Sequence, residues 1–126
     1  MKYIGNIEKE TLDNENFRKV LNTTTKSQLV VMTIQPGDDI GMEIHQEHDQ
    51  FIRIEQGKAE VILDGEKTIV QDDFAIVIPA GTEHNIINIG ENSLKLYTIY
   101  TPPEHPAGTI HKDKAEAIEY EKEHHS

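Results

Sequence analysis

The sequence has no cysteine, and this absence excludes several kinds of chemistry at once. Without thiols the chain has no disulfide, no thiolate metal ligand and no cysteine nucleophile. Any bound metal ion would therefore be held by nitrogen and oxygen donors. Serine is scarce too, and Ser27, Ser93 and Ser126 would lie at a strand edge, in a turn and at the terminus, where none resembles a nucleophile. No P-loop, dinucleotide-binding glycine pattern or G-x-S-x-G motif is present.

Basic residues and long apolar runs are also few. Lys and Arg number 12 against 23 Asp and Glu, which gives a formal net charge of −11. Such an acidic chain is poorly suited to nucleic acid or to an anionic membrane surface. No stretch approaches the roughly 20 apolar residues that span a bilayer, and the opening residues do not resemble a secretory signal. We therefore expect a soluble, cytoplasmic protein that binds neither nucleic acid nor membranes.

What the sequence does contain is a series of short, β-branched, apolar segments separated by turn signals such as Pro36-Gly37 and Asp64-Gly65. The segments predicted as strands are 28–34, 52–55, 58–63, 67–70, 74–78, 85–89 and 94–100. A parallel sheet would need helices between these strands, and none is indicated. The pattern therefore predicts an all-β fold, an antiparallel sandwich or barrel.

A single helix is predicted near the C-terminus, from about Lys112 to Glu123, where a narrow apolar stripe lies beneath an acidic face. We expect this helix to cap the barrel from outside. A length of 126 residues suits one domain. The predicted organisation is therefore a single domain over 1–126, with the barrel core at about 28–100 and a C-terminal loop and helix at 101–126.

The segment from Gly41 to Gly57, GMEIHQEHDQFIRIEQG, concentrates polar side chains in a region that otherwise resembles strand. Residues i and i+2 of a strand share a face, so Glu43 and His45 point the same way. In the following strand Gln50 shares a face with the apolar Ile52. If that face is inward, the three polar side chains meet inside the fold from paired neighbouring strands.

A further histidine, His84, follows a Pro-Ala-Gly turn at the start of a later strand, and barrel closure would bring it opposite the first cluster. This region resembles the second motif of the cupin superfamily, G-x5-P-x-G-x2-H-x3-N. It matches that motif at Pro79, Gly81, His84 and Asn88. The leading glycine alone is missing, because Asp73 stands in its place.

The first cupin motif, G-x5-H-x-H-x3,4-E-x6-G, is matched with two departures. Counted back from Gly57, Gln50 stands where the family has glutamate. His45 stands at the second histidine and Glu43 at the first. The chain is thereby similar to single-domain cupins, with the family's carboxylate moved to Glu43 and an amide in its former place.

The resemblance implies a single jelly-roll (double-stranded β-helix) barrel, a mononuclear divalent metal inside it, and a homodimer. Residues 95–112 further resemble the subgroup described as similar to phosphomannose isomerase. The implied metal ligands are Glu43, His45, Gln50 and His84. Imidazole, carboxylate and amide donors without thiolate suit Mn, Fe, Co, Ni or Zn. Gln50 could instead hydrogen-bond a neighbour, which would leave three protein ligands and open positions on the metal.

Other polar residues have two interpretations each. His48 belongs either to a solvated turn near the barrel mouth or to the metal or substrate site. Either Tyr97 or Tyr100 could reach the cavity, because strand parity alone does not say which of them faces inward. His105 and His111 lie in a loop that either folds over the barrel mouth or is exposed.

These features favour a metal-binding cupin. If it is an enzyme, the metal would act as a Lewis acid on a small oxygenated ligand such as a sugar or keto acid, and isomerisation is the expected reaction. The alternatives are a non-catalytic module that binds or senses a small molecule, an iron-dependent dioxygenase, and a structural cluster in which the four side chains bond only one another. A potent general base close to the metal would separate catalysis from binding alone.

Overall fold

The computed structural model describes residues 2–124. Its elements in chain order are α1 (Ile7–Asp13), β1 (Arg18–Thr23), β2 (Gln28–Ile34), β3 (Glu43–Ile44), β4 (Asp49–Gln56), β5 (Ala59–Leu63), β6 (Glu66–Val70), β7 (Ala75–Ile78), β8 (Glu83–Asn88), β9 (Leu94–Thr101), β10 (Ile110–His111) and α2 (Lys114–His124). All the predicted strand segments are present. The elements β1, β10 and α1 were not predicted, and the strand expected at Glu43 and His45 is the two-residue β3.

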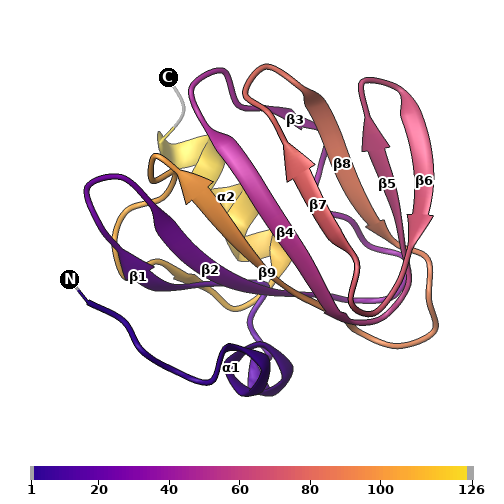
Figure 1. The fold of residues 1–126 in the computed structure, drawn as a ribbon, viewed down its shortest axis with the longest axis horizontal. Coiled ribbons are helices and arrows are strands. Elements are labelled where there is room, and N and C mark those ends of the chain that lie inside the picture. The colour runs from indigo at the N-terminus through magenta and orange to yellow at the C-terminus, as the bar shows by residue number, and fades with distance from the viewer. Residues whose placement is uncertain (1, 125–126) are drawn as a thin grey trace.

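The strands form two antiparallel sheets that enclose the interior (Figure 1). The six-stranded sheet has the order β10-β1-β2-β9-β4-β7, and the four-stranded sheet has the order β3-β8-β5-β6. Strands that are neighbours in space are mostly distant in sequence, as in β2 beside β9 and β5 beside β8. This arrangement confirms the all-β jelly-roll barrel with a short C-terminal helix.

Strand register places inward-facing side chains in rows across the six-stranded sheet. One row contains Gln28, Tyr100 and Gln50, which are Cα partners across β2, β9 and β4. Their exposed fractions are 1%, 3% and 4%. We call the part of the interior that this row lines the polar end of the barrel. The row at the opposite end of the same strands is apolar and consists of Met32, Leu96 and Ile54.

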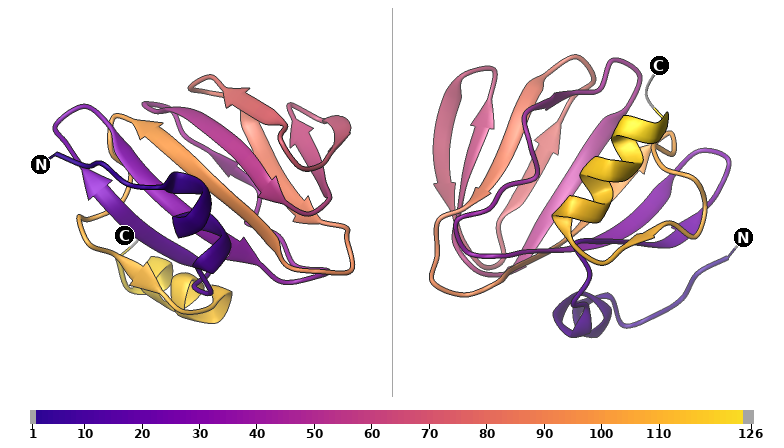
Figure 2. Two further views of the ribbon diagram at one scale, coloured as in Figure 1. Left: turned by 60° about the horizontal axis from the view of Figure 1, so that its bottom comes forward. Right: turned by 180° about the vertical axis from the view of Figure 1, so that it is seen from behind.

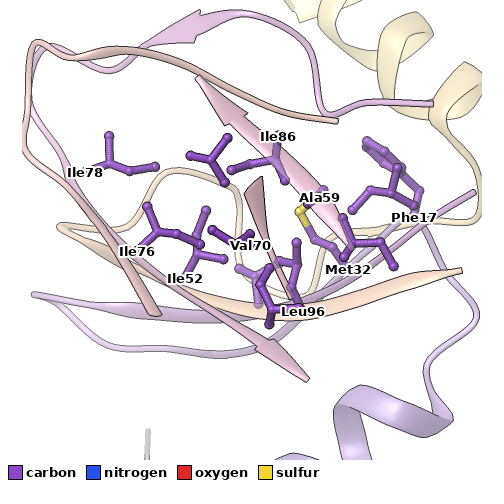
Figure 3. Close-up of a cluster of buried hydrophobic side chains, with 14 of the residues drawn as sticks. Phe17, Met32, Ile52, Ala59, Val70, Ile76, Ile78, Ile86 and Leu96 are labelled. Atoms are coloured by element: carbon purple, nitrogen blue, oxygen red, sulfur yellow. The ribbon is translucent and has the colours of Figure 1, made fainter. Parts of the chain in front are cut away.

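Aliphatic side chains from both sheets fill the rest of the interior (Figure 3). The largest of the fully buried apolar ones are Met32, Ile34, Ile52, Ile54, Ile78, Ile86, Leu94 and Leu96. Burying one such side chain contributes about 1.5–3 kcal/mol relative to leaving it exposed. The barrel's stability therefore comes mainly from this apolar part, and the polar end depends on it for support.

The C-terminal helix α2 begins at Lys114, slightly later than predicted. It lies on the inner side of the six-stranded sheet, beside the four-stranded sheet (Figure 2). Ala117 on α2 is 4% exposed and belongs to the same core cluster as Phe17. Lys114 Nζ donates to Asp38 Oδ1 at 3.0 Å and also to Asp39 Oδ1. The helix therefore packs on the barrel through Ala117, and most of its described side chains are exposed.

The N-terminal helix α1 was missed because it is 7 residues long and has no apolar stripe. Asn6 caps it by accepting a hydrogen bond from Lys9 N at 3.1 Å. It packs beside β9, β4 and β2, and Lys95 Nζ on the outward face of β9 donates to Asn14 O. Neither helix of the described part of the chain is long and apolar enough to cross a membrane.

The predicted pairing of the strands that carry Glu43 and Gln50 was wrong. The short strand β3 pairs with β8 in the four-stranded sheet, whereas β4 pairs with β9 and β7 in the six-stranded sheet. The segment 45–48 crosses from one sheet to the other where we had expected a hairpin turn between paired strands. Glu43 and Gln50 therefore come to the polar end from different sheets.

Candidate metal centre

His45 and His84, which are distant in sequence, are neighbours at the polar end. Glu43 in β3 is the Cα partner of His84 in β8, and His45 directly follows β3. The two imidazole centroids are 5.3 Å apart and the ring planes are inclined by 47°. Antiparallel pairing of β3 with β8 thus brings together two imidazoles and one carboxylate.

His84 is oriented by the backbone just before it. Its side chain is almost fully buried, and Nδ1 lies 2.9 Å from the carbonyl oxygen of Thr82. A carbonyl only accepts, so Nδ1 carries the proton and Nε2 keeps its lone pair. Burial lowers the pKa of His84, which keeps the ring neutral. A neutral imidazole held by one nitrogen is the form in which histidine binds metals.

Gln50 reaches the polar end from the facing sheet. Its Nε2 donates to Thr98 Oγ1 at 3.0 Å, which fixes the orientation of the amide. Its Oε1 is buried and has no hydrogen-bond partner among the described residues. An unpaired buried acceptor is unfavourable by about 1–3 kcal/mol. Gln50 therefore makes a hydrogen bond to a neighbour and still has an oxygen free for a cation or a donor.

His45 lies between two carboxylates. Its Nε2 is 3.4 Å from Glu43 Oε2, and its Nδ1 is 3.1 Å from Glu104 Oε2. Contact with Glu104, and then the charge of Glu43, raises the pKa of His45 in spite of its partial burial. Burial in turn raises the pKa of Glu43. A metal ion that bound His45 would have to displace the proton that these carboxylates favour.

Glu104 was not among the predicted site residues. Its Oε2 lies 3.0 Å from His48 Nε2, in addition to its contact with His45, although neither contact has hydrogen-bond geometry. Burial acts to raise the pKa of Glu104, but contact with His45 and the charges of His48 and His105 outweigh it, so the pKa lies below the usual value. Glu104 is thus a carboxylate held at the site in its basic form.

Gln28 positions the loop that carries Glu104. Its Oε1 accepts from Glu104 N at 3.2 Å and from His105 N at 2.9 Å, and its Nε2 donates to His105 O at 2.6 Å. His48 Nδ1 also lies 2.7 Å from Pro102 O. The loop therefore folds over the polar end, and His48 packs against it. Gln28, a polar residue at an inward position of an apolar strand, was the sequence signal that could have indicated this.

Tyr100 is the tyrosine that faces inward. Its ring lies 5.9 Å from that of His45 and 5.3 Å from that of His105, whereas Tyr97 packs outside against Phe51 at 6.3 Å. Burial raises the pKa of Tyr100 far above its usual value, so its hydroxyl stays protonated. Burial also lowers the pKa of His105 to about 3, so this imidazole is neutral.

The donors at the polar end are chemically suited to a metal ion. Within the part of the chain that the structure describes, no three His, Asp or Glu side chains are arranged as they would be around an ion. His45 is instead ion-paired with carboxylates. The remaining donors are nevertheless suitable: His84 has a free lone pair on Nε2, and Gln50 Oε1 is buried without a partner. Two imidazoles, a carboxylate and an amide oxygen match first-row divalent ions.

Comparison with known proteins identifies the family. Residues 30–100 match the family described as Cupin domain. The chain belongs to this family. It is 48% identical over 122 residues to the uncharacterized protein YrkC of Bacillus subtilis (strain 168), a match that covers 92% of this chain and 66% of that protein.

Solved structures show the same cupin fold. The crystal structure of BH2720 from Bacillus halodurans matches with a TM-score of 0.93 and 46% identity, over 94% of this chain and 95% of that one. KdgF from Halomonas sp. matches with a TM-score of 0.65 and 29% identity, over 69% of this chain and 78% of that one.

Two residues of the cupin motifs have structural roles. Asn88 Nδ2 donates to Ile34 O at 2.8 Å and to Asn92 O at 2.9 Å, and its Oδ1 accepts from Gly90 N at 2.9 Å. Gly57 has φ +116°, and a Cβ there would meet Leu94 Cα at 3.1 Å. Asn88 fixes the turn after β8 and Gly57 allows a close backbone approach, so neither contributes to the site.

Proposed function

We propose that this cupin binds one divalent transition metal ion, Mn, Fe, Co, Ni or Zn, at the polar end of its barrel. The proposed ligands are Glu43, His45, Gln50 and His84. The supporting observation is the pair of imidazoles 5.3 Å apart, together with a buried amide oxygen that has no partner. Such an ion, when bound, would polarise a substrate oxygen as a Lewis acid. His84 would bind through Nε2, since its Nδ1 donates to Thr82.

The proposed reaction is the isomerisation of a small oxygenated metabolite, such as a sugar or keto acid. Moving a proton between adjacent carbons needs a base that takes the proton and returns it. Glu104 Oε2 is the candidate, because it is buried, lies 3.1 Å from His45 Nδ1 and belongs to a carboxyl group whose lowered pKa keeps it deprotonated. The protonated hydroxyl of Tyr100 would serve as a neutral donor. A base beside the site favours an enzyme over a binding module.

The resemblance of residues 95–112 to cupins described as similar to phosphomannose isomerase agrees with this class of reaction. Glu104 and His105 lie within that stretch. The homodimer, the cytoplasmic location and the lack of nucleic-acid and membrane partners stay predictions.

Metal analysis of protein purified without added metal tests the site. We expect close to one equivalent in the unaltered protein and its loss in His84→Ala. His111→Ala is the matched control, because His111 is 5% exposed and lies outside the proposed set. Equal trace levels in all three proteins would rule out the proposed centre and leave the purely structural cluster.

Turnover of candidate sugars and keto acids by the metal-loaded protein tests catalysis. We expect Glu104→Gln to keep the metal and to lower turnover by at least about 100-fold, because it removes the general base. Binding of these compounds without turnover by the unaltered protein would support the non-catalytic module. Consumption of dioxygen by the iron-loaded form alone would support the dioxygenase.

A further inference from the structure

A cavity of about 450 Å³ lies beside the proposed metal centre, between the start of β1 and helix α2. This volume is within the range of about 300–1,000 Å³ found for small-molecule sites. Its walls are partly apolar and include Phe17, Ile40, Ala117 and Ile118, and the polar side chains Arg18 and Glu43 also line it. The cavity is therefore amphipathic, with both apolar and charged side chains on its walls.

Arg18 is a buried cation on the wall of this cavity. It is 5% exposed and faces inward, since its Cα partner in β2 is the core residue Met32. Its Nη1 lies 3.2 Å from His111 Nδ1, and its guanidinium stacks on Phe17 at 5.3 Å. Its Nε is buried and has no hydrogen-bond partner among the described residues. A buried guanidinium with an unused donor is best satisfied by an anionic acceptor.

The cavity adjoins the proposed metal centre. Glu43 lines both this cavity and the neighbouring one, which is also lined by His45, His48 and Glu104. A ligand held at Arg18 would therefore lie beside Glu43, which also borders the space around His45.

We propose that this cavity holds the carboxylate end of the substrate, with Arg18 as its anchor, and that the substrate is a small monocarboxylate with an apolar body. The inference rests on the proposed function, of which it names the substrate class. A guanidinium matches the planar geometry of a carboxylate and binds it through two parallel hydrogen bonds. The apolar walls would receive the hydrocarbon part of the ligand.

The charged side chains around the cavity favour a ligand that carries a single negative charge. Glu43 and Glu121 lie on its walls, and the whole chain carries a net charge of −11. Lys114 and Lys122 also line it, and the ammonium of Lys114 is held by Asp38 and Asp39. A second negative charge on the ligand would be repelled by the glutamates, so a carboxylate is favoured over a phosphate dianion.

Binding to metal-free protein tests the inference separately from the metal centre. The probes are 4-methyl-2-oxovalerate, its neutral counterpart 4-methyl-2-pentanone, and inorganic phosphate, each titrated calorimetrically after treatment with a chelator. We expect the oxo acid to bind at least about tenfold more tightly than the other two, because only it offers a carboxylate on an apolar body. Equal binding of the ketone, binding of phosphate as tight as that of the acid, or no binding of the acid would each overturn the proposal.

Single substitutions test whether Arg18 is the group that binds the carboxylate. Arg18→Gln should weaken binding of the oxo acid by at least about tenfold. Ile118→Trp, which fills the cavity from the half-exposed face of α2, should also weaken binding of the oxo acid while Arg18 stays in place. The test therefore does not depend on Arg18→Gln alone, which could lose binding through a folding defect. Lys19→Gln removes the next positive charge along β1, on the opposite face, and should leave binding unchanged. If Lys19→Gln weakens binding as much as Arg18→Gln, binding depends only on the overall charge of the protein, and the proposed role of Arg18 is refuted.

The two proposals can fail independently. Binding of the acid to metal-free protein that depends on Arg18, in a chain that never retains metal, would keep the cavity and refute the metal centre. Retention of metal that depends on His84, with no difference between acid and ketone, would keep the metal centre and refute the anchor.

Discussion

The barrel strands and the C-terminal segment 101–124 both contribute to the site, but they are held in different ways. In the barrel, Glu43 faces His84 through a backbone ladder, and Gln50 sits in a row fixed by its strand partners. The C-terminal segment is attached largely by side chains, with Gln28 holding the loop and Asp39 holding α2. The proposed metal ligands therefore belong to the rigid part, whereas the proposed base and one cavity wall belong to a part that can be altered separately.

The largest expected effect comes from weakening the barrel itself. Ile54→Ala removes most of a side chain with no exposed surface and leaves a cavity in the core, so it should lower the free energy of unfolding by about 2–5 kcal/mol. Ile118→Ala on α2 is the matched control, because Ile118 is 46% exposed and should change stability by less than about 0.5 kcal/mol. Urea unfolding of both variants measures the difference, and equal losses would contradict the contrast between the two regions.

A smaller effect is expected when the loop is detached from the barrel. Gln28→Ala removes the hydrogen bonds to Glu104 and His105 and should lower the free energy of unfolding by about 1–3 kcal/mol. Limited proteolysis should then cut near residues 102–106, and turnover should fall while metal content stays the same. Gln56→Ala, which loses one bond to Ser93 O at 3.2 Å, is the control for removing a glutamine. Loss of metal together with the loop would show that the two regions are not separable.

The smallest effect concerns the attachment of α2 through Lys114 and Asp39. The hydrogen bond from Lys114 lowers the pKa of Asp39 in the folded state. The pair therefore stabilises the fold at pH values above the usual carboxyl pKa of about 3.9. This stabilisation is lost as the pH falls through the lower pKa of the folded state. Both side chains are partly exposed, so Asp39→Asn should reduce stability by at most about 1 kcal/mol at neutral pH. The difference from the unaltered protein should disappear in acid. A difference that grew as pH fell would have the wrong sign for this pair.

The strands and the position of His84 could be predicted because the residues that indicate them lie close together in the sequence. Alternation and turn residues determine which side chains share a face, and motif spacing places His84 at the start of β8. The partner of β3 could not be predicted in this way. With only two residues, Glu43–Ile44, this strand has no pattern of its own, and its pairing with β8 depends on a segment far along the chain.

The position of Glu104 was beyond prediction for a related reason. Its loop has no periodicity, and its course depends on the hydrogen bonds to Gln28, which is separated from Glu104 by 76 positions. The helix α2 was predicted from its composition, but the way it packs on the barrel follows from the burial of Ala117 in the core cluster. Sequence patterns thus indicated the barrel and four candidate ligands, whereas contacts between distant side chains determined the position of Glu104, the proposed base.

One consequence follows from the site's position between the two sheets. Glu43 and His84 belong to the four-stranded sheet and Gln50 to the six-stranded one, and β3 is an edge strand. An ion shared by these residues would cross-link the sheets where their backbones are not hydrogen-bonded to each other, and its binding energy would add to the energy that keeps the chain folded. Metal starvation would then shorten the lifetime of the protein in the cell.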